Sequence, residues 1–272
     1  MKQNFSARTT ALDDALGVGR CFDMTARDLT IGGRRARLWV VNGYAQEGVL
    51  ERIIAQWLAA PDLTDMKTPD AFLRRFVTAC DAAVCLKKEA AVLGVFSGKT
   101  LLVVDGWDGG ILMDVKQFPT RSIEEPDTSR VLRGSHDGFV ENLMQNAALL
   151  RRRIRDPRLT LEQIRLDNRS RTDVALCYLE GEADPDLLRE LRQKLAKMRV
   201  GSIAMSQESV AEAISPKQWY NPFPKVRYTE RPDVASACIM EGDVVLMVDN
   251  SPSAMLLPTT LLRFTEEIND YY

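Results

Sequence analysis

Two stretches of this chain occur twice in the same order, and the repetition limits the folds that the chain can adopt. Residues 98–105 (Gly-Lys-Thr-Leu-Leu-Val-Val-Asp) align with residues 242–249 (Gly-Asp-Val-Val-Leu-Met-Val-Asp), an offset of 144 residues (242 minus 98). Residues 38–43 (Leu-Trp-Val-Val-Asn-Gly) align with residues 176–181 (Leu-Cys-Tyr-Leu-Glu-Gly), an offset of 138 residues (176 minus 38). Because unrelated matches would not share both order and spacing, the sequence predicts two copies of one α/β unit.

Each copy shows the pattern of a strand pair, a helix, a second short helical segment and a closing hairpin. In the second copy, residues 172–178 show the two-residue alternation that is typical of a half-buried strand. The helix that follows has Asp184 to cap its free backbone N–H groups, Pro185 for its first turn and Gly201 for its end. The predicted fold class is α/β, with two similar small modules in which helices cover mixed sheets.

A third helix is expected between the two copies. Its apolar face starts near Asp137 and the pattern stops before Pro157, with Asp137 as the favoured N-cap and Ser135 as the competing one. This helix should bridge the modules. The predicted division is a flexible N-terminus (1–15), a first module (16–126), a connector with the bridging helix (127–159) and a second module (160–272).

Two patterns resemble a phosphate-binding loop and a hydrolase triad, but neither has the residue arrangement that such a site requires. Residues 94–100 (Gly-Val-Phe-Ser-Gly-Lys-Thr) resemble a phosphate-binding loop, yet the spacing is one residue short and the lysine precedes a strand rather than a helix. The second copy has Asp243 in place of Lys99, so a hairpin turn is the favoured interpretation. The triplet Ser135-His136-Asp137 has the residue types of a hydrolase triad, but consecutive side chains diverge and cannot form a relay.

Metal, cofactor and disulfide chemistry find little support. The chain has one histidine and five cysteines, with no C-x-x-C pair, which argues against a zinc site and against a disulfide framework. The cysteines are expected to be reduced core residues. We therefore predict no catalytic residue, no metal, no cofactor and no enzymatic activity.

Charge is distributed unevenly along the chain. The net charge is −2, but residues 130–171 hold ten Arg and no Lys against five acids. Arg151-Arg-Arg-Ile-Arg155 could contact nucleic acid, lie solvated at a helix end, or pair with carboxylates. Because the chain is acidic overall and no aromatic residues interleave with the arginines, we expect no nucleic-acid partner. Pairing with carboxylates is slightly favoured over solvation.

Hydropathy indicates a water-soluble chain. The most apolar runs, residues 90–104 and 244–262, are interrupted by Lys99 or by Asp249 and prolines, whereas a bilayer-spanning helix needs about 20 apolar residues. No apolar block follows the basic residues at the N-terminus, so no secretory signal is expected. These observations favour the cytosolic side of a membrane.

Four segments resemble the soluble N-terminal region of GerA-type spore germination proteins. They are residues 130–143, 146–159, 221–233 and 241–258, so the likeness runs through most of the chain. Residues 16–23 and 32–43 look closer to the SpoVAF branch than to the nutrient-receptor A subunits. Two departures stand out: residues 133–139 (Arg-Gly-Ser-His-Asp-Gly-Phe) lack the family's proline and basic residue, and Val-Asp-Asn-Ser replaces the usual Val-Asp-Gly-Thr.

The resemblance implies a function without catalysis. In the family, a two-part α/β domain precedes a bundle of membrane helices in the spore inner membrane, and A-type subunits act with a transporter-like B subunit and a lipoprotein C subunit. Members are thought to oligomerise into ion-conducting channels. We expect this chain to be the cytoplasmic regulatory and assembly domain of such a protein, a homo-oligomer in its full-length form, with the membrane region absent.

The residues expected to form a ligand site or subunit interface are arginines in and around the basic stretch, together with a proline-rich loop. Asn-Pro-Phe-Pro at 221–224 presents an aromatic side chain on a rigid backbone, although a structural connector is favoured there. The alternative function is a small-molecule binding module, with ligand in the cleft between modules and Arg130 and Arg133 holding an anion. The full set is Arg121, Arg130, Arg133, Arg151, Arg152, Arg153, Arg155, Asn221, Pro222, Phe223 and Pro224.

Overall fold

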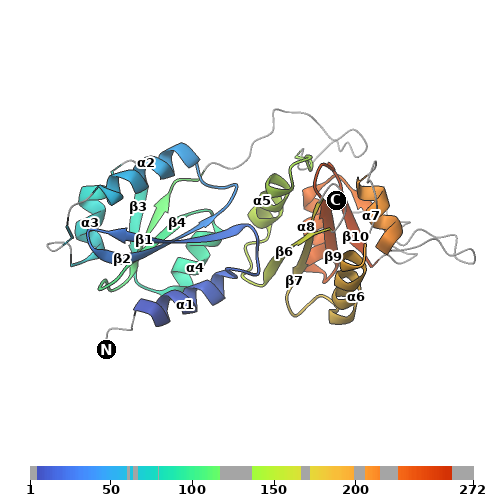
Figure 1. Cartoon of the computed structure of the whole chain (residues 1–272), viewed down its shortest axis with the longest axis horizontal. Helices are drawn as coiled ribbons and strands as arrows, with labels where there is room; N and C mark the ends of the chain where they lie inside the picture. The colour runs from blue at the N-terminus through green and yellow to red at the C-terminus, as the bar shows by residue number, and fades with distance from the viewer. Residues whose placement is uncertain are drawn as a thin grey trace, which may run out of the picture. The chain divides into compact units, whose positions relative to one another are not determined.

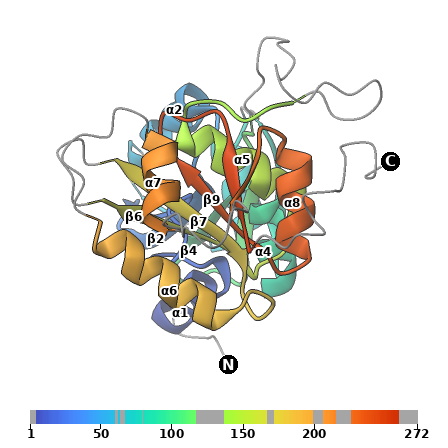
Figure 2. The ribbon, with the colours of Figure 1, turned by 90° about the vertical axis from the view of Figure 1, so that its right-hand side faces the viewer.

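The computed structural model divides into two compact units, each built as a sheet between helices (Figures 1 and 2). Unit 1 comprises Met1–Pro119 with Arg155–Pro157, and unit 2 comprises Thr120–Ile154 with Arg158–Tyr272. The structure describes residues 5–59, 62–63, 67–78, 80–116, 137–166, 172–198, 206–214 and 226–258, except for the side chains of residues 47 and 206.

Unit 1 holds a five-stranded sheet in the order β1-β2-β4-β5-β3, and every neighbouring pair is antiparallel. Helices α2 and α3 lie on one face of this sheet, and α1 and α4 lie on the other (Figure 1). The elements are α1 (Phe5–Leu16), β1 (Met24–Ile31), β2 (Arg34–Val41), α2 (Glu47–Leu58), α3 (Pro69–Phe76), β3 (Asp81–Cys85), α4 (Lys88–Phe96), β4 (Thr100–Val104) and β5 (Gly110–Asp114).

Unit 2 repeats this arrangement with the strand order β6-β7-β9-β10-β8, again antiparallel throughout. Figure 2 shows α6 and α7 on one side of the sheet and α5 and α8 on the other. The elements are α5 (Leu143–Arg153), β6 (Leu159–Arg165), β7 (Asp173–Leu179), α6 (Pro185–Ala196), α7 (Ser206–Ile214), β8 (Arg227–Thr229), α8 (Pro232–Met240), β9 (Val244–Val248) and β10 (Ala254–Leu257).

The predicted duplication is confirmed down to the pairing of single residues. Ala36 pairs with Val104 in unit 1, and the residues 138 and 144 positions later, Val174 and Val248, pair in unit 2. Both central strands, β4 and β9, are buried along their whole length because helices cover both sheet faces. The sheets that we expected to be mixed contain only antiparallel pairs among the described strands.

Helix α5 is the counterpart of α1, since Phe5 and Leu143 open the two helices at an offset of 138 residues. Within unit 2, α5 packs against α8, β7 and β9, and its expected role as a bridge between the modules stays a prediction. The segment 1–15, which we expected to be flexible, contains most of α1, and Leu12 and Leu16 of that helix are buried. Each module therefore begins with its own helix.

The observed ends of α6 and α4 agree only in part with the ends predicted from the sequence. Asp184 caps α6 as predicted, accepting a hydrogen bond from the N–H of Asp186 at 2.8 Å. The helix ends at Ala196, and Gly201, its predicted end, lies outside the described residues. The hairpin turn predicted at residues 94–100 was wrong, because buried Val95 and Phe96 belong to the last turn of α4, Ser97 and Gly98 end the helix, and Lys99 leads into β4.

Candidate interaction site

The segments that resemble the germination family come together around the first turn of α5. Asn142 caps this helix by accepting a hydrogen bond from the N–H of Gln145 at 3.0 Å. Asp249, the residue after β9, accepts a second hydrogen bond from the N–H of Leu143 at 3.3 Å. Asn250 follows with a φ of 64°, and its N–H donates to the carbonyl of Glu141 at 2.8 Å. The motif residues therefore fix the backbone that enters α5.

One buried amide holds the segment before the helix. Asn146 accepts from the N–H of Val140 at 2.8 Å and donates to the carbonyl of the same residue at 2.5 Å. One residue earlier, the N–H of Phe139 donates to the carbonyl of Glu230 at 2.8 Å, and the Phe139 side chain is 2% exposed. The segment Asp137–Asn142 is thus held by α5 through Asn146 and by the residues that lead into α8 through Glu230.

Four charged side chains from three parts of unit 2 gather beside this segment. Arg153, in the last turn of α5, pairs with Asp137 at 2.5 Å. Arg231, which is buried, donates to Asp233 at 3.1 and 2.5 Å. Burial raises the pKa of Asp233, but hydrogen bonds from Arg231 and the N–H of Val234, with the charges of Arg231 and Arg153, outweigh it and hold this pKa below its ordinary value.

This pairing corrects one expectation and agrees with another. Asp137 does not cap the helix, because α5 begins six residues later and the adjacent Asn142 reaches its first N–H groups. Asp137 is an ion-pair partner of Arg153 instead. Pairing of the basic cluster with carboxylates, which we favoured over solvation, is thus present for Arg153.

The predicted interface residues fall into three groups. Arg152 and Arg155 are exposed. Arg151 is fully buried and its Nη1 donates to the carbonyl of Leu159 at 3.0 Å, so this side chain contributes to no surface. Arg153 is half-buried and paired with Asp137, as described above. The third group lies outside the described residues, as do Ser135 and His136: Arg121, Arg130, Arg133, Asn221, Pro222, Phe223 and Pro224.

Sequence reasoning missed Asn146, Arg231 and Asp233 as members of this site. A signal was present for Asn146, because it is a polar residue on the apolar face that α5 buries. Asp249 was noticed only as part of a motif, and its contact with Leu143 joins residues 106 positions apart. Such a contact follows from the tertiary fold alone.

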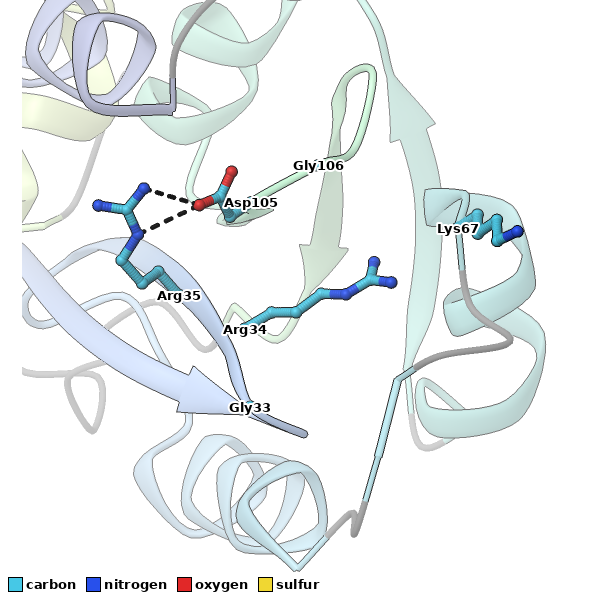
Figure 3. A pocket seen from close by; sticks show the side chains of 6 residues that line it. All are labelled: Gly33, Arg34, Arg35, Lys67, Asp105 and Gly106. Carbon is cyan, nitrogen blue, oxygen red and sulfur yellow. Dashed lines mark hydrogen bonds and ion pairs between the residues drawn. The ribbon is translucent and has the colours of Figure 1, made fainter.

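Unit 1 has an open pocket of about 470 Å³ between its two hairpin turns. Gly33, Arg34 and Arg35 line it from the β1–β2 turn, Asp105 and Gly106 line it from the β4–β5 turn, and Lys67 completes it. In Figure 3, Arg34 and Arg35 point in opposite directions, and Arg35 turns toward Asp105, which it contacts at 2.7 Å. The lining therefore holds three cations and one carboxylate, and this carboxylate is already paired.

Neither unit shows a metal centre or a membrane span within the described residues. No group of three or more His, Cys, Asp or Glu side chains in the described part of the chain is placed to hold a metal ion. None of the described helices combines the length and the apolar character that crossing a bilayer requires.

Comparison with known proteins agrees with the motif segments. The family model described as Bacillus/Clostridium GerA spore germination protein matches residues 11–272. The chain belongs to the GerA family. Stage V sporulation protein AF of Bacillus subtilis is 38% identical over 260 residues, which cover 94% of this chain and 52% of that protein. Spore germination protein B1 of the same organism is 34% identical over 177 residues, covering 65% of this chain and 36% of that protein.

A solved structure confirms the two-module fold. The N-terminal domain of the A subunit of the Bacillus megaterium spore germinant receptor GerK3 matches with a TM-score of 0.72 at 24% identity, covering 96% of this chain and 97% of that chain. At that identity the likeness shows the fold alone. The chain spans about half the length of stage V sporulation protein AF.

Proposed function

We propose that this chain is the regulatory and assembly region of a GerA-family germination protein, a nutrient-receptor A subunit or a SpoVAF-like channel. It acts at the cytoplasmic face of the spore inner membrane, beside a membrane region outside this chain, and it has no enzymatic activity. Membership of the family and the shared fold with a germinant-receptor N-terminal domain support the proposal. The coverage of about half of stage V sporulation protein AF is consistent with one part of a larger protein.

One structural observation carries the proposal. The family-like segments make backbone contacts around α5: Asn142 and Asp249 cap the helix, and Asn146 holds Val140. Side chains used in this way stiffen a junction and are not left to bind a ligand or react. A stiff junction suits a domain that positions other subunits and transmits movement to them.

The proposed partners are further copies of this chain and, in a receptor, B-type transporter-like and C-type lipoprotein subunits. The exposed end of the basic stretch, Arg152 and Arg155, offers charge to such partners. Arg153, which lies between these two arginines in the sequence, is paired with Asp137. The loop at 221–224 and Arg121, Arg130 and Arg133 complete the proposed interface.

Charge reversal at the exposed arginines tests this function. In a spore-forming bacterium that produces the full-length protein, Arg152→Glu with Arg155→Glu should slow germination and weaken cross-linking to neighbouring subunits, because rim charges guide association. The matched control is Arg189→Glu, an exposed arginine on α6. Germination and cross-linking equal to those of the unaltered protein in both variants would refute the assembly role.

Binding of an anionic small molecule is a second candidate, favoured by the cationic pocket of unit 1. A ligand that binds the folded chain must raise its melting temperature. We expect an anionic amino acid or nucleotide in a screening panel to do so, and Arg34→Ala to reduce the shift. A flat response across amino acids, sugars and nucleotides would remove the support for this candidate.

A further inference from the structure

The two units differ at the start of α4 in unit 1 and of its equivalent, α8, in unit 2. Lys88 and Pro232 open the equivalent helices α4 and α8 at an offset of 144 residues. In unit 2, Arg231 is 2% exposed and Val234 is 6% exposed. The equivalent residues of unit 1, Lys87 and Ala90, are both exposed. Among the described residues, the start of α8 is therefore covered by other parts of the chain, whereas the start of α4 is not.

In unit 2 the extended segment Asp137–Asn142 lies beside the residues that lead into α8, and α5 packs on α8 itself. Phe139 of this segment is buried, and the N–H of this residue donates to the carbonyl of Glu230, two residues before α8. Asp137 is held by the guanidinium of Arg153 at 2.5 Å. Unit 2 thus shows how a short segment, with one aromatic residue between two acids, Asp137 and Glu141, fits against this kind of helix.

In unit 1 the corresponding surface is apolar and open. Leu86, the position equivalent to Glu230, is 71% exposed, and Leu93 on the outer side of α4 is 59% exposed. Exposed Ala90 lies between them in sequence, three residues before Leu93 and therefore on the same helix face. A helix face turned to solvent is ordinarily polar, so an apolar one indicates contact with a partner. We call Leu86, Lys87, Lys88, Ala90 and Leu93 the α4 surface.

Charge beside the α4 surface indicates the sign of its partner. Lys87 and Lys88 are exposed next to Leu86, beside the exposed acid Glu89, and a second exposed acid, Asp108, lies near Arg8. Arg8 occupies the position in α1 that corresponds to Asn146 in α5, and its Nη1 donates to the carbonyl of Trp107 at 3.0 Å. Where unit 2 has a neutral amide, unit 1 therefore has another cation. A partner with carboxylates complements this set.

We propose that the α4 surface binds an extended segment of a partner protein in which an aromatic residue is flanked by carboxylates. The segment would take the place that Asp137–Asn142 takes in unit 2, with the aromatic ring against Leu86 and Leu93 and the acids beside Lys87 and Lys88. Docking of an extended segment with one anchoring side chain is a common form of peptide recognition. This inference rests on the proposed assembly function and names the surface and the partner chemistry that it uses.

The test measures binding of a defined peptide to the 272-residue chain. A fluorescein-labelled peptide with the sequence Asp-Gly-Phe-Val-Glu-Asn-Leu should bind with saturable anisotropy, and replacing its Phe by Ala or its acids by amides should weaken binding. Leu86→Glu and Leu93→Glu should each weaken it by about tenfold or more, since an anchoring apolar contact is lost. Both side chains are exposed, so the fold tolerates the changes.

Leu58→Glu is the matched control, because Leu58 is 55% exposed in unit 1 at the end of α2. Its binding should stay within about twofold of the unaltered chain. Absence of binding at millimolar peptide, or equal loss in Leu86→Glu and Leu58→Glu, would overturn the inference. Two other results would also overturn it. One is that Leu86→Glu abolishes self-association in sedimentation but leaves peptide binding intact, and the other is that it abolishes binding to anionic phospholipid vesicles but leaves peptide binding intact. Failure here leaves the germination result for Arg152 and Arg155 unaffected, so the two proposals can fall separately.

Discussion

Buried polar side chains in unit 2 bind backbone groups of the segments beside α5. Asn146 binds both backbone groups of Val140, and Arg151 binds the carbonyl of Leu159, the first residue of β6. An unsatisfied buried group costs about 1 to 3 kcal/mol, so each of these side chains constrains the local path of the chain. At the scale of single residues, the family-like motif is a set of backbone contacts.

Substitution of Arg153 should destabilise the contact between α5 and the segment that precedes it. Arg153→Ala removes the ion pair with Asp137 and a favourable charge beside Asp233, so we expect the free energy of unfolding to fall by about 1 to 2 kcal/mol. Urea denaturation measures this value. Arg155→Ala, two residues away and exposed, should change it by less than about 0.5 kcal/mol. Equal effects of the two substitutions would contradict the pairing.

Asp233 gives unit 2 a dependence on acid. Its folded-state pKa lies below the ordinary value of about 3.9, so its contribution to stability is fully present above that pH and is lost as the pH falls through the folded-state pKa. Asp233→Asn should therefore be less stable than the unaltered chain at neutral pH, and the difference should shrink below about pH 4. Urea titrations at several pH values test this. A difference independent of pH would rule out the assigned role.

At the scale of elements, the two copies keep their geometry and exchange their polar interactions. Asp13 of α1 accepts from the indole N–H of Trp39 at 2.8 Å and pairs with Arg37 at 2.9 Å. The equivalent residue of α5 is Arg151, which has the opposite charge and binds a carbonyl instead. Apolar positions such as Leu12 and Leu150 are buried in both copies. Packing therefore preserves the shared fold, while the polar contacts have diverged.

The β1–β2 hairpin offers a matched pair of glycines. Gly32 has a φ of 49°, and a Cβ there would lie 2.8 Å from the backbone N of Leu63 and 2.9 Å from the backbone C of Asp62. Gly33 has a φ of 76°, and a Cβ there would meet nothing within 4 Å. Gly33→Ala should cost about 1 to 2 kcal/mol from backbone strain alone. Gly32→Ala should cost at least about 1 kcal/mol more, because backbone atoms must move. Similar midpoints in urea would contradict this contact.

At the scale of the whole molecule, each unit has a hydrophobic core of its own. One core joins Trp57, Phe72 and Trp107 to sheet residues of unit 1, and the other joins Leu191, Leu195 and Val210 to the sheet of unit 2. Each sheet is thus stabilised chiefly by helices from its own unit. This organisation predicts that damage to one core stays largely within one unit.

Leu102→Ala tests this independence. Leu102 is fully buried in β4, so its truncation should cost about 2 to 5 kcal/mol. Hydrogen exchange should accelerate for amides in β2, β4 and β5, while the slowest amides of β7 and β9 keep their rates. Equal acceleration in both sheets would mean that the chain unfolds as one cooperative body.

Local sequence patterns were sufficient for the features that depend on neighbours in the chain. The repeat of residues 98–105 at 242–249 predicted two equivalent modules, and Asp184 marked the start of α6. The site around α5 was only partly predictable. Its arginines were noticed from composition, but the burial of Arg151 and the pairing of Arg153 with Asp137 were not. Equally, nothing in residues 94–100 distinguished a hairpin turn from the end of a helix.

The amino-acid sequence alone determined the duplicated α/β architecture, because apolar periodicity and order along the chain are local properties that repeat with the fold. Only the tertiary structure decided which residue caps α5, which arginine is buried and which helix face stays open. Asp249 binds Leu143, which lies 106 positions away in the sequence, and Phe139 binds Glu230, which is also distant along the chain. Contacts of this kind depend on packing between distant segments, and burial rather than residue type then sets what each side chain does.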